Sequence, residues 1–71
     1  MNEETYIIKD RVVEFFKDRG VSEQLEVIVE RFLQSYFEYG KSVTVAVEHA
    51  SLSGVKLSKN DLIELEEILR L

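Results

Sequence analysis

The sequence predicts an all-α fold in which a short, a long and a short helix form one domain, 1–71, that pairs with a second chain. Apolar residues recur every three or four positions in three segments, which is the period of helices with a buried face. The 71 residues include no proline, and glycines and serines separate the segments. Because the chain has no cysteine for disulfides, a domain this small is expected to need a partner for stability.

The first helix is expected over residues 3–18. Val12, Phe15 and Phe16 lie at helical spacing and form the centre of its apolar stripe. Gly20 follows closely, and glycine is favoured just beyond the last turn of a helix. The sequence therefore predicts that the first helix ends before Gly20.

The middle helix is expected to run from about Glu23 to Ala50. Ser22 precedes it and is a good N-cap, because serine accepts hydrogen bonds from the unpaired N–H groups of a first turn. Gly40 interrupts this helix at a cost of about 1 kcal/mol. Its apolar residues form two rows, which predicts one face against the chain's own helices and another against a partner. The predicted dimer interface consists of Leu25, Ile28, Phe32, Tyr36, Phe37, Tyr39, Val43 and Val47.

Residues 41–50 permit a second interpretation. Val43, Val45 and Val47 alternate with other residues, which is the period of a half-buried strand. A lone strand leaves unpaired backbone groups at both edges, and the sequence offers no clear second strand. We therefore predict helix, which continues the apolar stripe. The alternative is a swapped dimer in which residues 42–48 pair as strands across a two-fold axis.

The last helix is expected to begin directly after Ser58, beyond a loop over residues 51–56. Ser58 is a suitable N-cap, and Asp61 three residues later can complete a capping-box-like pair. Leu62 and Leu65 begin the apolar stripe of this helix. The serine–aspartate pair is the cleanest local signal in the chain.

The composition narrows the classes of function. With no cysteine and a single histidine, His49, the chain lacks the ligands of a metal site, and we expect no cofactor and no small-molecule substrate. Glu64, Glu66 and Glu67 are typical of a solvated helix face, so we expect no catalytic residues and no enzyme. No apolar run approaches the roughly 20 residues that span a membrane, and the acidic N-terminus lacks a signal-peptide pattern. An intracellular location is expected, in the cytoplasm, the nucleoid or the nucleus.

Three short motifs resemble the histone-fold family. Residues 21–23, Val-Ser-Glu, resemble the opening of the long central helix of archaeal histones. Residues 47–50, Val-Glu-His-Ala, are similar to the end of that helix, and residues 57–62 resemble the start of the third histone helix. The resemblance implies an archaeal-histone-like chain or a small acidic histone-fold subunit. Its partner would be a second copy or a related histone-fold chain.

Two departures from the histone pattern bear on function. Histones usually pair the aspartate of the third helix with an arginine seven residues earlier, but Gly54 stands at that position. Asp61 is therefore expected to lack the arginine clamp that is usual in histones. The second loop also lacks the basic motif of DNA-packaging histones. These departures favour a dimerisation subunit of a larger, DNA-associated complex over a DNA-wrapping histone.

The net charge of −5 opposes binding to DNA. Four cations nevertheless lie near predicted loops, and a histone-fold pair would bring them together as candidates for contact with DNA phosphates: Lys17, Arg19, Lys56 and Lys59. We expect such contact to be weak or to depend on a more basic partner. The alternative function is that of a small acidic helical regulator, such as an antitoxin-like or phage-type inhibitor, that occludes a protein target.

Overall fold

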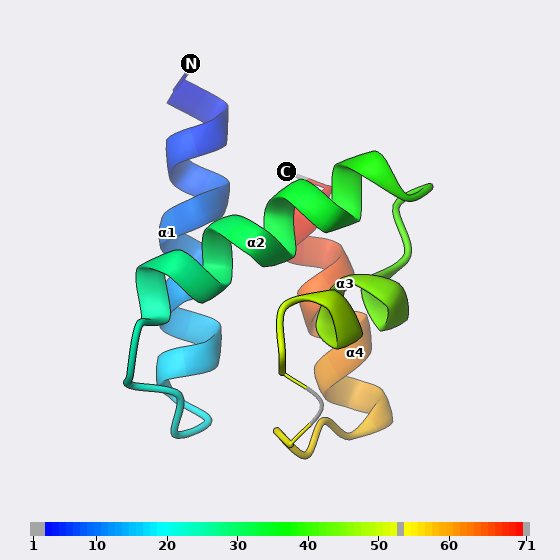
Figure 1. Ribbon diagram of the computed structural model, residues 1–71. Helices are drawn as coiled ribbons and strands as arrows, with labels where there is room; N and C mark the ends of the chain where they lie inside the picture. Colours follow the sequence, from blue (N-terminus) through cyan, green and yellow to red (C-terminus); the bar gives the residue numbers. More distant parts are fainter. Residues whose placement is uncertain (1–2, 53, 71) are drawn as a thin grey trace.

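The computed structural model describes residues 3–52 and 54–70, and all regular structure in these ranges is helical (Figure 1). The helices follow one another as α1 (Glu3–Lys17), α2 (Leu25–Glu38), α3 (Val43–His49) and α4 (Lys59–Leu69). This confirms the predicted all-α class. It also confirms the first helix to within one residue at its end.

The four helices enclose one core. In Figure 1 α2 crosses diagonally in front of α1, and α3 lies below the far end of α2. α2 packs against α1 and α3, while α4 packs against the same two helices. The buried apolar side chains come from all four helices and from the segment after α3: Val12, Phe15, Phe16, Val29, Phe32, Tyr36, Val43, Ala46, Ala50, Leu52, Leu65 and Leu69.

Aromatic rings form the contact between α1 and α2. The Phe16 ring is fully buried and lies edge-on to Phe15 and Phe32, with centroid distances of 5.1 and 5.4 Å. The Phe32 ring stacks in turn on Tyr36, at a centroid distance of 6.5 Å. Edge-to-face and offset-stacked rings are the favoured arrangements of aromatic pairs. The helical spacing of these residues therefore produces a continuous aromatic core.

The prediction of one long helix from Glu23 to Ala50 is wrong, because the chain turns between α2 and α3. Gly40 and Lys41 adopt positive φ angles of 76° and 58°, which no continuing helix allows. Ser42 then caps α3, as its hydroxyl accepts a hydrogen bond from the Val45 N–H. The turn folds α3 back onto α2 and buries Val43. Val43 is therefore buried against the chain's own helices, whereas in one long helix it would be exposed to a partner.

The helix predicted within residues 41–50 is confirmed over Val43–His49, so the chain does not adopt the strand alternative. The two predicted N-caps have different outcomes. Ser58 forms a complete capping box with Asp61 at the start of α4, as predicted. Ser22 does not cap α2, because the residue before α2 is Gln24, which has a left-handed backbone and makes no side-chain cap bond.

Candidate functional site

The predicted interface residues fall into three groups by exposure. Phe32, Tyr36 and Val43 are buried in the core of the single chain, where a partner reaches them only if the chain opens. The second group is half-buried and packs against this core: Leu25, Ile28 and Val47. Phe37 and Tyr39 remain on the surface, with 53% and 55% of their area exposed. These two are the interface candidates that a partner can contact directly.

Two aromatic contacts hold the exposed rings at the end of α2. The Phe37 ring lies edge-on to Tyr36 at a centroid distance of 5.1 Å, and the Tyr39 ring lies edge-on to His49 of α3 at 4.9 Å. Each ring is therefore supported on one side and open to solvent on the other. Such side chains lose little conformational entropy when a partner covers them.

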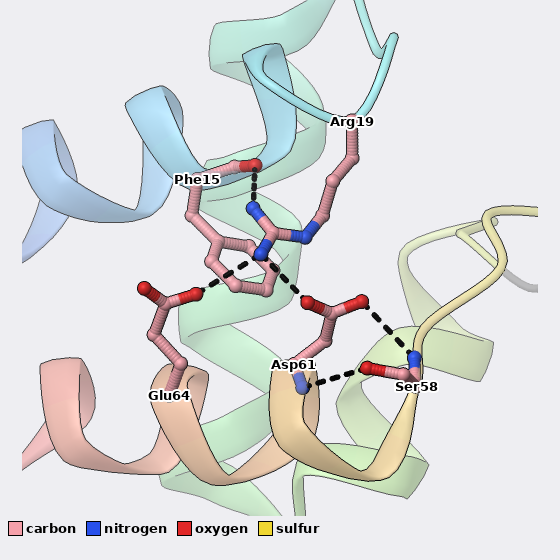
Figure 2. A network of polar contacts seen from close by, with 5 residues as sticks. All are labelled: Phe15, Arg19, Ser58, Asp61 and Glu64. Atoms are coloured by element: carbon pink, nitrogen blue, oxygen red, sulfur yellow. Dashed lines mark hydrogen bonds and ion pairs between the residues drawn. The ribbon is translucent and has the colours of Figure 1, made fainter.

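The second candidate region is an ion-pair cluster that joins the turn after α1 to the start of α4 (Figure 2). The Arg19 guanidinium donates hydrogen bonds to the Phe15 carbonyl at 2.9 Å, to Asp61 at 2.7 Å and to Glu64 at 3.0 Å. It also lies 3.6 Å from the centroid of the Phe15 ring, in cation–π contact. The cluster therefore connects α1 to α4 through one side chain.

The hydrogen bond from Arg19 lowers the pKa of Asp61 from 3.8 to about 2, and the hydrogen bonds of the Ser58 capping box act in the same direction. The same ion pair raises the pKa of Arg19. Both oxygens of the Asp61 carboxylate accept hydrogen bonds. One accepts from Arg19, and the other accepts from the Ser58 N–H at 3.0 Å. Both contacts are stronger with the ionised carboxylate, which is why they lower its pKa.

Asp61 lacks the arginine seven residues earlier, since Gly54 stands there, but it has another arginine as its partner. Its partner is Arg19, which lies 42 positions away in the sequence instead of seven. Nothing in the local pattern around either residue indicates this pair, because only the packing of α1 against α4 brings them together. Arg19 was also predicted to contact DNA phosphates, and within the chain its guanidinium binds two carboxylates instead.

An open groove of about 980 Å³ runs along the same α1–α4 junction. Its lining includes two apolar side chains, Phe15 and Ile68. The other lining residues are charged: Asp10, Arg11, Glu14, Asp18, Arg19, Asp61, Glu64 and Glu67. Six carboxylates against two arginines leave a net charge of −4, compared with −5 for the whole chain. The negative charge of the protein is therefore concentrated on this side.

The three remaining candidates for phosphate contact are exposed lysines: Lys17, Lys56 and Lys59. Lys17 ends α1 and Lys59 begins α4, and Figure 1 shows these two helix ends at the same end of the molecule. Arg19 and Asp61 join the two elements there. The fold thus places Lys17 and Lys59 at one end of a single chain, where Asp18 and Asp61 of the groove also lie.

Within residues 3–52 and 54–70, no group of three histidine, aspartate or glutamate side chains is arranged to hold a metal ion. No helix in this part of the chain is long and apolar enough to cross a membrane. Comparison of the sequence and fold with models of protein families, with curated proteins and with solved structures found no match.

Proposed function

We propose that the protein acts by binding another protein chain, either a second copy of itself or a related one. The observation that carries this proposal is the number of large apolar side chains that are about half exposed. They lie on α1, on α4 and in and just after α2: Tyr6, Ile7, Val27, Phe37, Tyr39 and Ile63. Aromatic side chains are enriched at the centres of protein interfaces.

The finer form of this proposal is a histone-fold pair. It requires α2 and α3 to join into one helix through Tyr39–Ser42 when the partner binds. This change would release the left-handed backbone of Gly40 and Lys41 and expose Val43 to the partner. A rise in helix content on association, measured by circular dichroism across a dilution series, tests this form. An unchanged helix content argues against it and leaves association through the folded monomer.

Any contact with DNA would use the exposed lysines Lys17, Lys56 and Lys59. We propose that such contact is weak in the isolated chain, because Arg19 is occupied by carboxylates and the adjacent groove repels a polyanion. A salt-titrated binding assay on duplex DNA tests this point. Submicromolar binding with a steep salt dependence would contradict it.

The acidic groove favours a second candidate function, that of a small regulator that occludes a basic surface of a target protein. The net charge of −4 in one groove would steer a cationic partner towards α1 and α4. Reversal of groove charges at Glu14 and Glu67 would then abolish binding of the target. The same variant would leave self-association intact, which separates the two functions.

The mass in solution is the decisive experiment for the main proposal. Sedimentation equilibrium of the purified chain at low to high micromolar concentration is expected to show species heavier than 8.3 kDa. If the chain sediments as a folded monomer throughout, self-association is wrong. The proposal then survives only if a related chain raises its thermal stability on mixing.

A further inference from the structure

The outward side of α2 has features that suit contact with an identical helix. Val27, Arg31, Gln34 and Glu38 follow one another at steps of four, three and four residues, so they form one row along the helix. All four are exposed, and the exposed ring of Phe37 lies at the edge of the row. In Figure 1 no other helix passes in front of α2. The row is therefore open to a partner.

This side of α2 carries little net charge. Glu26, Glu30, Arg31 and Glu38 lie on α2, and Lys9 of α1 binds Glu30, so these five groups sum to −1. Lys9 of α1 binds Glu30 at 2.9 Å, while Arg31 and Glu38 form no ion pair with any described residue of the chain. Two copies that each carry a net charge of −5 repel one another, and most of that charge lies in the α1–α4 groove. The α2 side is where they can approach without this repulsion.

We propose that two copies of the chain pair through α2 in antiparallel orientation, with Gln34 of each copy at the two-fold axis. This inference rests on the proposed function and names the partner as a second copy. Around such an axis, a residue before Gln34 faces the residue that lies equally far beyond Gln34 in the other copy. Arg31 then faces Phe37 of the second copy and lies next to its Glu38.

These positions are complementary in charge and shape. The Arg31 guanidinium can bind the Glu38 carboxylate of the second copy and cover the exposed face of its Phe37 ring. The two-fold axis repeats the contact, so each dimer has it twice. Glu30 of one copy would lie directly opposite Glu38 of the other. Repulsion between these two carboxylates is reduced, because Lys9 forms an ion pair with Glu30.

The expected affinity follows from the size of the contact. α2 has 14 residues and is about 21 Å long, so one helix pair covers less than the roughly 800 Å² per partner of a standard interface. The dimer is therefore expected to dissociate in the micromolar range.

A charge-swap series tests the pairing on the full-length chain. Arg31→Glu places glutamates opposite one another and is expected to weaken dimerisation about tenfold or more at low salt, as is Glu38→Arg. The double variant Arg31→Glu/Glu38→Arg restores opposite charges and is expected to return the dissociation constant close to that of the parent. Because both side chains are exposed, circular dichroism should show that every variant is folded.

A cysteine scan provides an independent readout, since the natural chain contains no cysteine. Gln34→Cys is expected to form a disulfide-linked dimer under mild oxidation, because two copies of the axis residue come within bridging distance. Asp10→Cys, in the α1–α4 groove, is the matched control and is expected not to cross-link.

The outcomes separate this inference from the proposed function. If the chain dimerises but tolerates both single reversals, or the double variant fails to recover, the α2 interface is wrong and association through another face stands. If the parent is monomeric throughout, the α2 pairing is wrong, and association with a related chain is judged by the mixing experiment.

Discussion

Phe32 and Phe37 lie five residues apart on the same helix, yet they belong to different parts of the molecule. Phe32 is fully buried between the Phe16 and Tyr36 rings, whereas Phe37 has 53% of its surface exposed. Five residues correspond to about 500° of rotation along a helix, so the two side chains leave α2 at well-separated angles. One inward-facing and one outward-facing aromatic residue on a single helix allow separate tests of folding and of association.

The difference shows that the chain covers only one side of α2 with its own helices. The inner row is covered by α1 and α3, so the chain supplies its own core. The outer side includes Val27 and Phe37 and receives no such cover from the described helices. A domain of this size needs most of its apolar side chains for its own core. Its exposed aromatic residues are therefore the candidates for contact with a partner.

The largest expected effect concerns the core. Phe32→Ala should lower the free energy of unfolding by about 3–5 kcal/mol, because it removes a fully buried ring and leaves a cavity next to Phe16. Chemical denaturation at a protein concentration that favours monomer would measure this loss. A loss below about 1 kcal/mol would show that the inner row is not a packed core.

A smaller loss is expected at the turn that ends α2. Gly40 has a φ angle of 76°, so Gly40→Ala should cost roughly 1–2 kcal/mol through backbone strain alone, since no atom lies within 4 Å of the added methyl group. Gly54→Ala is the matched control, because it has equal space and no positive φ, and should be close to neutral. Thermal melts of both variants measure the difference. Stabilisation by Gly40→Ala would instead indicate that α2 and α3 form one helix in solution.

The α1–α4 junction should make a pH-dependent contribution to stability through Asp61. The pKa of Asp61 is lowered from 3.8 to about 2 in the folded chain. Between these two pH values Asp61 therefore binds fewer protons in the folded chain than in the unfolded chain. Its stabilising contribution is complete above pH 4 and is lost as the pH falls towards 2. Melting temperatures of the parent and of Asp61→Asn should therefore converge at low pH. Parallel profiles would mean that the Arg19–Asp61 pair does not form in solution.

The smallest effect on stability is expected at Phe37. Phe37→Ala should change the free energy of unfolding of the monomer by about 1 kcal/mol or less, since the ring contacts Tyr36 only on one side. The same substitution should weaken self-association measurably in sedimentation. Equal and large losses of stability for Phe32→Ala and Phe37→Ala would remove the distinction between the two rings.

The features that depend on near neighbours in the chain could be predicted before the fold was known. The period of three and four residues predicted helices, and the structure is helical throughout its described elements. Ser58 and Asp61 predicted the capping box at the start of α4, because both halves of that motif lie within one turn. Ser22 was a less complete signal, and the chain begins α2 later, at Leu25.

Tertiary structure alone decided which of several locally acceptable arrangements the chain adopts. Gly40 is compatible with a weak helix interruption and with a sharp turn, and the burial of Val43 and Ala46 in the core accompanies the turn. The Arg19–Asp61 pair has no local signal at all, since 42 residues separate its members. The period of the apolar residues predicts which of them share one face of a helix. Whether the rest of the chain covers that face depends on how the helices cross. Phe37 and Phe32 differ for this reason.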